Sequence, residues 1–524
     1  MGKFILAYDL GTGGSKASLY NKEGRCITRT FIPYDTLYPD VGWHEQRPND
    51  WWNAVVESTR RLLKSGEVKI NDIECLALSG QSLGVVPIDR KGKLLRETVP
   101  IWSDTRTPVQ TSKFFRRIQP TEWYMLTGNG FSKECYSVFK IMWYRDNEPD
   151  MFSRIHRVLG SKDYINYRLT GELCTDYSYA SGSGIYNLKE WRYEPRLVQA
   201  SGLSAELFPE IVPSTQVIGT VTRESAETLG LSTNVKVVCG GVDNACMAVG
   251  AGNIVEGRVY LSLGSSAWIA VSSHDPIVDC KIKPFVFTHV IPNMFTSATS
   301  IFSAGNSLKW VRDTLCKNIK DMAERENRDP YEMMTELAAE SPAGARKLLF
   351  NPSLAGGSAA HLGPQIRGAF LGLDLSHTQA DVIRAVLEGI SFDLRIMLDK
   401  LAELCALSEE VILVGGGSKS KLWRQIFANV FDRTIVKTNV DQDAASLGAA
   451  AVAAVGTEIW KNFNIIDEIL IREDVEQPQN EVVRMYNDLL PLYASFFQYQ
   501  SKLGRHFSAL MVPQSSEAEK RMHR

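Results

Sequence analysis

The sequence YDLGTGGSKASLY (residues 8–20) combines the end of an apolar strand, a turn rich in glycine and hydroxyl side chains, and the start of a second strand. The sequence LSLGSSAWIAVS (residues 261–272) repeats this pattern in the second half of the chain. Glycine allows the backbone to turn tightly at both places. The repeat predicts a duplicated α/β fold with a cleft between the two copies.

Strands and helices alternate around both turns. Apolar runs of period two predict strands, and apolar residues three or four positions apart predict amphipathic helices. In the first half we expect strands at 3–10, 15–21, 25–32 and 73–80, and a helix at 49–65. In the second half we expect strands on both sides of the turn within 257–273, a helix at 384–404 and a strand–helix unit at 409–431. This order predicts mixed sheets with helices packed on them.

The length of 524 residues is too great for one hydrophobic core, so at least two domains are expected. We expect an N-terminal domain at residues 1–247, a C-terminal domain at 248–505 and a flexible tail at 506–524. The tail is predicted from its low apolar content.

The composition is that of a globular protein, with 44% hydrophobic and 23% charged residues. A formal net charge of -2 gives no reason to expect nucleic acid or an anionic membrane as partner, so a small solute is the expected ligand. No stretch has the length of a membrane span or the pattern of a signal peptide. Nine cysteines without a CxxC pair argue against a disulfide framework or a zinc site, and predict a reducing, cytoplasmic location.

The first glycine turn is a candidate phosphate-binding loop. Backbone N–H groups of glycines and nearby hydroxyls can surround phosphate oxygens. The spacing is neither that of a Walker loop nor that of a dinucleotide fingerprint, and the turn leads into a strand rather than a helix. A plain glycine hairpin, in which Asp9 accepts turn N–H bonds, is the alternative. The candidate residues are Gly11, Thr12, Gly13, Ser15 and Lys16.

Two later glycine segments are further nucleotide candidates. Gly264, Ser265 and Ser266 form a turn in the second half that matches the first glycine turn. Two such turns could bind a polyphosphate from two sides, although hairpins of this composition are common. Gly415, Gly416 and Gly417 lie between a strand and a helix, where a nucleotide or simply a tight turn is expected. The helix that follows at 440–456 consists of very small residues, which predicts close packing against another element.

Polar residues after two further strands could bind a polyol. They are Gln81 and Ser82, and the group Trp102, Asp104 and Arg106. Hydroxyls need both donors and acceptors, and an aromatic face covers the C–H side of a sugar. A surface ion pair between Asp104 and Arg106, which would stabilise little, is the alternative.

Asp243 stands at the junction of strand and helix in VKVVCGGVDNACMAVG (residues 235–250). Taken alone, an acid at this position is a helix cap, a role that stabilises by about 1 kcal/mol. The other interpretation is a general base.

Together these segments resemble the FGGY family of carbohydrate kinases, and most closely its xylulokinase branch. The resemblance extends from about residue 5 to residue 453 and includes DLGTGGSK, GWHEQRPNDWW, IWSDTR, GGVDNACMAVG, LSLGSS and VGGGSKSKLW. GAFLGLDLSHTQADVIRAVLE (residues 368–388) fits the C-terminal signature of the family throughout. In CYSVFKIMWYRDN the N-terminal signature is matched by Ser137, Lys140, Trp143, Asp146 and Asn147, but not by Cys135 and Tyr144.

The resemblance implies two ribonuclease-H-like α/β domains, as in actin and hexokinase, with an interdomain cleft. It implies ATP-dependent phosphorylation of a sugar, with Asp243 as the general base and Asp9 and Asp243 as ligands of Mg²⁺. The sugar residues would be Gln81, Ser82, Leu83, Trp102, Asp104, Arg106, Asp243 and Asn244. The nucleotide residues would be the candidates above together with Gly305 and Ser418. A homodimer is expected from the resemblance alone.

Two departures affect the choice of sugar. Gln81, Ser82, Leu83 and Gly84 stand where xylulokinases commonly have Gln-Met-His-Gly, and AGGSAAH (residues 355–361) replaces Ser-Gly-Glu-Arg-Thr-Pro. Such changes can shift specificity between related sugars. We expect conversion of D-xylulose to D-xylulose 5-phosphate; the alternatives are ribulose, erythrulose, a hexulose, a polyol or a sugar acid such as gluconate, and a non-catalytic nucleotide or sugar sensor.

Overall fold

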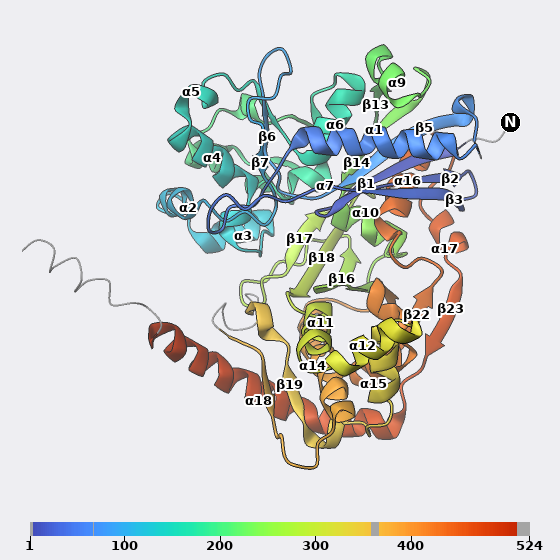
Figure 1. The fold of residues 1–524 in the computed structure, drawn as a ribbon. Helices are drawn as coiled ribbons and strands as arrows, with labels where there is room; N and C mark the ends of the chain where they lie inside the picture. Colours follow the sequence, from blue (N-terminus) through green and yellow to red (C-terminus); the bar gives the residue numbers. More distant parts are fainter. Residues whose placement is uncertain (1–3, 67, 358–365, 511–524) are drawn as a thin grey trace, which may run out of the picture. The chain divides into compact units, whose positions relative to one another are not determined.

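The computed structural model describes residues 4–66, 68–357 and 366–510 (Figure 1). The chain forms two compact units. The first comprises the described residues of Met1–Tyr260, Ala270–Ala298 and Thr438–Arg472, and the second those of Leu261–Ile269, Thr299–Lys437 and Glu473–Arg524. Of the predicted tail, residues 506–510 belong to the last helix, and residues 511–524 lie outside the described part.

A six-stranded mixed sheet organises the first unit. Its strands, in spatial order, are β13 (Val217–Thr220), β14 (Lys236–Val242), β5 (Ile73–Gly80), β1 (Phe4–Leu10), β2 (Gly14–Asn21) and β3 (Cys26–Pro33). β14, β5 and β1 are parallel, whereas β2 and β3 are antiparallel to their neighbours. The four strands expected in this half of the chain are therefore confirmed.

Both faces of this sheet are covered by helices, because side chains alternate between the faces along each strand. Leu6, Tyr8 and Leu10 of β1 pack on one face with α1 (Pro48–Lys64), which Figure 1 shows lying along the sheet. Ile5 and Ala7 point to the other face, where α10 (Asp243–Gly250) and α16 (Ala444–Gly456) pack. Strands buried on both faces explain the nearly continuous apolar sequences of β1 and β5.

The other elements of the first unit are short helices and two-stranded pairs. The helices are α2 (Pro108–Phe114), α3 (Pro120–Thr127), α4 (Ser137–Asn147), α5 (Pro149–Phe152), α6 (Ser161–Thr170), α7 (Tyr177–Ala180), α8 (Pro195–Ser201), α9 (Arg223–Leu229), α17 (Ile465–Ile469), η1 (Ile70–Asp72), η2 (Lys133–Cys135) and η3 (Ala205–Leu207). The pairs are β4 (Glu45–Gln46) with β7 (Val99–Pro100), β6 (Val86–Ile88) with β8 (Arg157–Leu159), β9 (Cys174–Asp176) with β12 (Glu210–Val212), and β10 (Tyr186–Asn187) with β11 (Arg192–Tyr193).

The second large sheet has seven strands. In spatial order they are β17 (Phe285–Thr288), β18 (Phe295–Ile301), β16 (Ala267–Ser273), β15 (Val259–Leu263), β21 (Glu410–Val414), β22 (Thr434–Thr438) and β23 (Arg472–Glu476). β15 and β16 are the strands expected on both sides of the second glycine turn.

The second unit contains a pair of short strands and several helices. The strands are β19 (Leu349–Asn351) and β20 (Ala369–Leu371). The helices are α11 (Gly305–Thr314), α12 (Lys317–Glu326), α13 (Pro330–Ala338), α14 (Gln379–Ala402), α15 (Lys421–Phe431), α18 (Asn480–Leu510), η4 (Ala345–Lys347), η5 (Ser353–Ala355) and η7 (Gly416–Lys419). The predicted long helix is α14, which is longer at its N-terminus than expected.

The predicted close packing of the small-residue helix is confirmed, because α16 crosses α10 at backbone contact distance. A Cβ atom added to Gly448 would lie 1.8 Å from the carbonyl oxygen of Cys246. A Cβ atom added to Gly250 would lie 1.8 Å from the carbonyl oxygen of Ala444. Only glycine fits at these two points, so the helix that begins with Asp243 is fixed against α16.

We predict that Gly448→Ala lowers the free energy of unfolding by about 1–3 kcal/mol, because two helix backbones must separate to admit the methyl group. Urea unfolding of the purified variant measures this loss. Gly13→Ala is the matched control, since a Cβ atom there meets nothing within 4 Å. Equal stability of the two variants would contradict the tight helix crossing.

Candidate active site

Three parallel strands bring the first group of candidate residues to one edge of the sheet. Leu10 of β1 and Val242 of β14 both pair with Gly80 of β5. Asp9, Gln81 and Asp243 therefore lie at or just beyond the carboxyl ends of adjacent strands. The carboxyl ends of parallel strands are the usual place for ligands in α/β sheets.

Asp243 is the first residue of α10, and Val242 holds the capping position before it. Its Oδ1 accepts a hydrogen bond of 2.8 Å from the backbone N–H of Asn244. Both residues are partly exposed. Burial among protein atoms, followed by repulsion from Asp9, raises the pKa of Asp243 to about 7. The carboxylate thus contributes to the helix N-terminus and also has the pKa of a base that works near neutral pH.

Asp9 lies beside Asp243, and its Oδ1 accepts a hydrogen bond of 3.0 Å from the hydroxyl of Ser79. Burial raises the pKa of Asp9, while Lys16 and Ser79 oppose this shift. Two partly dehydrated carboxylates that repel each other favour a bound cation. No group of three or more His, Cys, Asp or Glu side chains that could hold a metal ion occurs among the described residues.

The first glycine turn is an exposed hairpin closed by a hydrogen bond of 3.0 Å from the N–H of Gly11 to the carbonyl of Gly14. Thr12 is bound on two sides. Its carbonyl accepts a hydrogen bond of 2.7 Å from Nε2 of Gln46, and its hydroxyl accepts one of 2.9 Å from Nε1 of Trp102. Thr12 thereby connects the turn to the candidate sugar loop.

Ser15 and Lys16 differ from the exposed residues of this turn. Ser15 is fully buried, and its hydroxyl has no partner among the described residues. The Lys16 ammonium donates to the carbonyl of Gln442 at 2.6 Å and lies 3.0 Å from Asp443. The side chain of Lys16 is therefore engaged with the segment that precedes α16.

The first candidate sugar loop follows β5. Gln81 is buried; its Nε2 donates to Oε1 of Gln46 at 2.7 Å, and its Oε1 has no partner among the described residues. Ser82 is partly exposed. Leu83 has a φ of 61°, a left-handed conformation that costs energy for a residue with a side chain. Such strain is common at functional sites.

Gln46 connects the first glycine turn with the first candidate sugar loop, through Thr12 and Gln81, and the sequence alone did not indicate this role. Its Oε1 also accepts a hydrogen bond of 2.9 Å from Nε1 of Trp51. Its position within the quoted segment GWHEQRPNDWW was the only signal. The contacts themselves join residues far apart in the chain, so neither spacing nor composition indicates them.

The alternative of a surface ion pair between Asp104 and Arg106 is wrong, because both side chains are fully buried. The two groups lie 2.7 Å apart, and Arg106 also lies 2.6 Å from Glu45. The guanidinium packs on the ring of Trp43, 3.9 Å from its centroid. Of the three candidate residues in this loop, Trp102 is the partly exposed one. Asp104 and Arg106 therefore support the loop from inside the protein.

The second unit brings together the remaining candidate residues. The N–H of Gly305, the first residue of α11, donates to the carbonyl of Gly264, and the N–H of Asn306 donates to that of Ser265, both at 3.0 Å. Gly415 approaches the same turn, since a Cβ atom added to it would lie 2.7 Å from the carbonyl of Leu263. Gly264, Ser265 and Ser266 are exposed.

The glycine segment 415–417 differs from the prediction in one respect. It does not open directly into a helix, because the single turn η7 precedes α15, which begins at Lys421. Ser418 is buried, and its hydroxyl donates to the carbonyl of Gly415 at 2.7 Å. Gly416 is the exposed residue of the segment.

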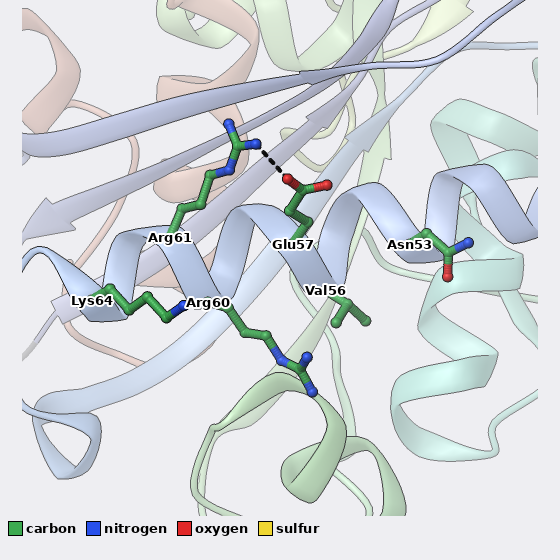
Figure 2. A pocket seen from close by; sticks show the side chains of 6 residues that line it. All are labelled: Asn53, Val56, Glu57, Arg60, Arg61 and Lys64. Carbon is green, nitrogen blue, oxygen red and sulfur yellow. Dashed lines mark hydrogen bonds and ion pairs between the residues drawn. The ribbon is translucent and has the colours of Figure 1, made fainter.

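A hollow of about 270 Å³ lies on the exposed side of α1 and contains none of the candidate residues (Figure 2). It is lined by Asn53, Val56, Glu57, Arg60, Arg61 and Lys64. Its cations are engaged locally: Arg61 pairs with Glu57, and Nε of Arg60 donates to the carbonyl of Thr228 at 2.9 Å. Cations near the end of a helix also interact favourably with its dipole.

Comparison with known proteins defines the class as an ATP-dependent sugar kinase with an actin- and hexokinase-like two-domain fold. The models for the N-terminal and C-terminal domains of the FGGY family of carbohydrate kinases match residues 4–250 and 259–457. The chain belongs to this family. None of the helices described is long and apolar enough to cross a lipid bilayer.

Individual relatives differ in their named substrates. The chain is 30% identical to a xylulose kinase of Bacillus subtilis (strain 168), over 96% of this chain and 98% of that relative. It is 26% identical to a gluconate kinase of Lactobacillus acidophilus, whose crystal structure matches with a TM-score of 0.88 over 97% of this chain and 100% of that one. A ligand-bound xylulose kinase structure from the same organism matches with the same TM-score and identity over 96% and 100%.

We predict that Arg106→Met lowers the free energy of unfolding by about 3–5 kcal/mol, because it leaves Asp104 buried without its cation and removes one of the two arginines that pair with Glu45. Urea unfolding measures the loss. In the control Arg61→Met, an exposed ion pair is removed, and the loss is expected to stay below about 1 kcal/mol. Similar losses in both variants would contradict the assignment of a buried network.

Proposed function

We propose that the enzyme phosphorylates a ketopentose, converting D-xylulose to D-xylulose 5-phosphate, with Asp243 as the general base. The observation that carries this proposal is the pairing of Asp243 with Asp9 at the sheet edge, which together with burial raises the pKa of Asp243 to about 7. A base with this pKa is about half ionised at pH 7, and its ionised form can accept a proton from a sugar hydroxyl in the transition state.

Asp9 and Asp243 would hold Mg²⁺. Hard oxygen ligands suit this ion, which is commonly bound by one or two carboxylates together with water and substrate phosphates. The raised pKa of both acids supports the fit, because a cation would relieve their dehydration and repulsion. When bound, Mg²⁺ neutralises charge on the phosphates of ATP.

Exposed backbone turns would bind the nucleotide. Thr12 and Gly13 in the first unit, and Ser265 and Ser266 in the second, would offer N–H groups and hydroxyls to phosphate oxygens. The N–H groups of Gly11, Gly264 and Gly305 would instead shape these turns, because they donate to carbonyls of the turns themselves. We assign the nucleoside to 415–418, where Gly416 is exposed. Ser15, Lys16 and Ser418 would act mainly by shaping these turns, given the burial or the engagement of their side chains.

The sugar would lie on Gln81, Ser82, Trp102 and Asn244, next to Asp243. Leu83, Asp104 and Arg106 would position these groups from behind. The unpartnered Oε1 of Gln81 supports this arrangement, because a buried acceptor without a donor is costly and a sugar hydroxyl would supply one.

D-Xylulose is the preferred substrate because the motifs and the Bacillus relative agree on it. Gluconate, named for one of the matched crystal structures, is the main competitor, followed by ribulose, erythrulose, a hexulose and polyols. Of the altered segment AGGSAAH, residues 358–361 lie outside the described part. We infer a cytoplasmic enzyme without nucleic-acid or membrane partners, which fits the net charge of -2; a homodimer is proposed from the family resemblance only.

The deciding experiment measures ADP release with Mg-ATP and a panel of acceptors. The panel contains D- and L-xylulose, D- and L-ribulose, erythrulose, xylitol, D-arabitol, glycerol and gluconate. The highest kcat/KM is expected with D-xylulose. A higher value with another acceptor overturns the substrate, and turnover of none overturns the proposed function.

We predict that Asp243→Asn reduces kcat with the best sugar by about 10²–10⁴-fold, because the isosteric amide cannot accept the proton. ATP binding, measured by calorimetry, is expected to persist. Glu227→Gln, which alters an exposed acid of the same unit, serves as control and is expected to keep full activity. Unchanged turnover in Asp243→Asn would exclude this residue as the base.

We predict that kcat/KM falls about tenfold per pH unit below pH 7, because the base form of Asp243 is lost as pH drops through its pKa of about 7. Above that pH the profile is expected to be flat until another group titrates. Rates measured from pH 5 to 8 test the slope. An unchanged rate at about pH 5 would contradict the raised pKa.

A further inference from the structure

We infer that Lys140 on α4 is a positioning residue for the sugar, because its ammonium binds the main chain of both candidate sugar loops at once. The inference rests on the proposed function, since it takes residues 81–85 and 101–106 to be the loops that contact the sugar. Lys140 matches the N-terminal family signature, but the sequence assigns it no role.

The contacts of Lys140 join two segments that are separate in the chain. Its side chain is buried, and its Nζ donates to the carbonyl of Leu83 at 3.1 Å and to that of Ile101 at 2.5 Å. Leu83 follows Gln81 and Ser82, and Ile101 directly precedes Trp102. One ammonium group therefore fixes the distance between the two loops.

Tyr144 extends this contact by one helical turn. Residues four positions apart lie on the same face of a helix, and the Tyr144 hydroxyl donates to the carbonyl of Val85 at 3.1 Å. The neighbouring Trp143 contacts the second loop, with its ring centroid 4.9 Å from the guanidinium carbon of Arg106. Helix α4 thus binds the first loop at two carbonyls and the second loop at its entry.

The chemistry of Lys140 is unusual for a residue that only fills space. Both of its hydrogen-bond partners are neutral carbonyls, and burial lowers its pKa to about 8. Burying a charged group with neutral partners costs free energy, whereas an apolar side chain of similar size would fill the same volume without that cost. In return for this free-energy cost, Lys140 fixes the positions of the carbonyls of Leu83 and Ile101.

The first loop needs such a fixed point. Leu83 has a positive φ, so its backbone would relax toward a more favourable conformation if its carbonyl were released. Its side chain is confined as well, because a Cβ atom added to Gly182 would lie 2.9 Å from Cδ2 of Leu83. Relaxation would turn Gln81 and Ser82 away from the geometry that the sugar requires.

Lys140→Met tests the inference, because methionine keeps the volume and removes the donors. We expect the sugar kcat/KM to fall by about tenfold or more, mainly through KM, since small misplacements of binding groups are costly. The KM for ATP is expected to change less than the KM for the sugar, since Lys140 binds the two sugar loops directly and is connected to the first glycine turn only through Trp102 and Thr12. Met142→Ala is the matched control: it removes a buried side chain from the same helix, but a methionine side chain has no donor for either loop carbonyl.

Each outcome decides a separate point. A normal sugar KM in Lys140→Met overturns the inference, and so does an equal rise of KM in Met142→Ala at a similar melting temperature. If Lys140→Met does not fold, Tyr144→Phe replaces it: a raised sugar KM supports the inference and an unchanged one overturns it. Absence of sugar turnover in the unmodified enzyme instead overturns the proposed function, and the inference falls with it.

Discussion

The parallel pairing of β14, β5 and β1 is the constraint on which the rest of the site depends. It brings Asp9, Gln81 and Asp243, which are far apart in the chain, to one edge of one sheet. Strand hydrogen bonds fix this arrangement, so loop conformation hardly affects it. The two acids are thereby held close enough to repel each other, and that repulsion contributes to the raised pKa of Asp243.

Behind this edge lies a layer of residues that do not contact substrate in the proposed arrangement. Gln46 connects Thr12 with Gln81, and the ion pair of Asp104 and Arg106 supports the loop of Trp102. Preorganised groups of this kind avoid reorganisation during the reaction, which is the main contribution that phosphoryl transfer asks of a protein. The division between contacting and supporting residues also explains why few of the predicted sugar residues are exposed.

Much of the fold could be predicted from the sequence because its signals are local. The glycine turns, the strands around them and the small-residue helix α16 each follow from neighbouring residues. The burial of Asp104 and Arg106 could not be predicted, because a charged pair in a loop has the same local sequence on a surface and in a core. Lys140 was missed for a related reason: its carbonyl partners lie 57 and 39 positions away. Such contacts exist only after the chain has folded.

The position of α16 has a consequence for synthesis on the ribosome. This helix covers the face of the first sheet that carries Ile5 and Ala7, yet it is encoded near the end of the chain. The ribosome synthesises the chain from the N-terminus onward at about 5–20 residues per second. The apolar face with Ile5 and Ala7 is therefore made early, and α16 covers it late. During this interval the nascent sheet exposes an apolar surface to which other chains and chaperones can bind. The helix that begins with Asp243, the proposed general base, is therefore fixed against α16 only when translation is almost finished.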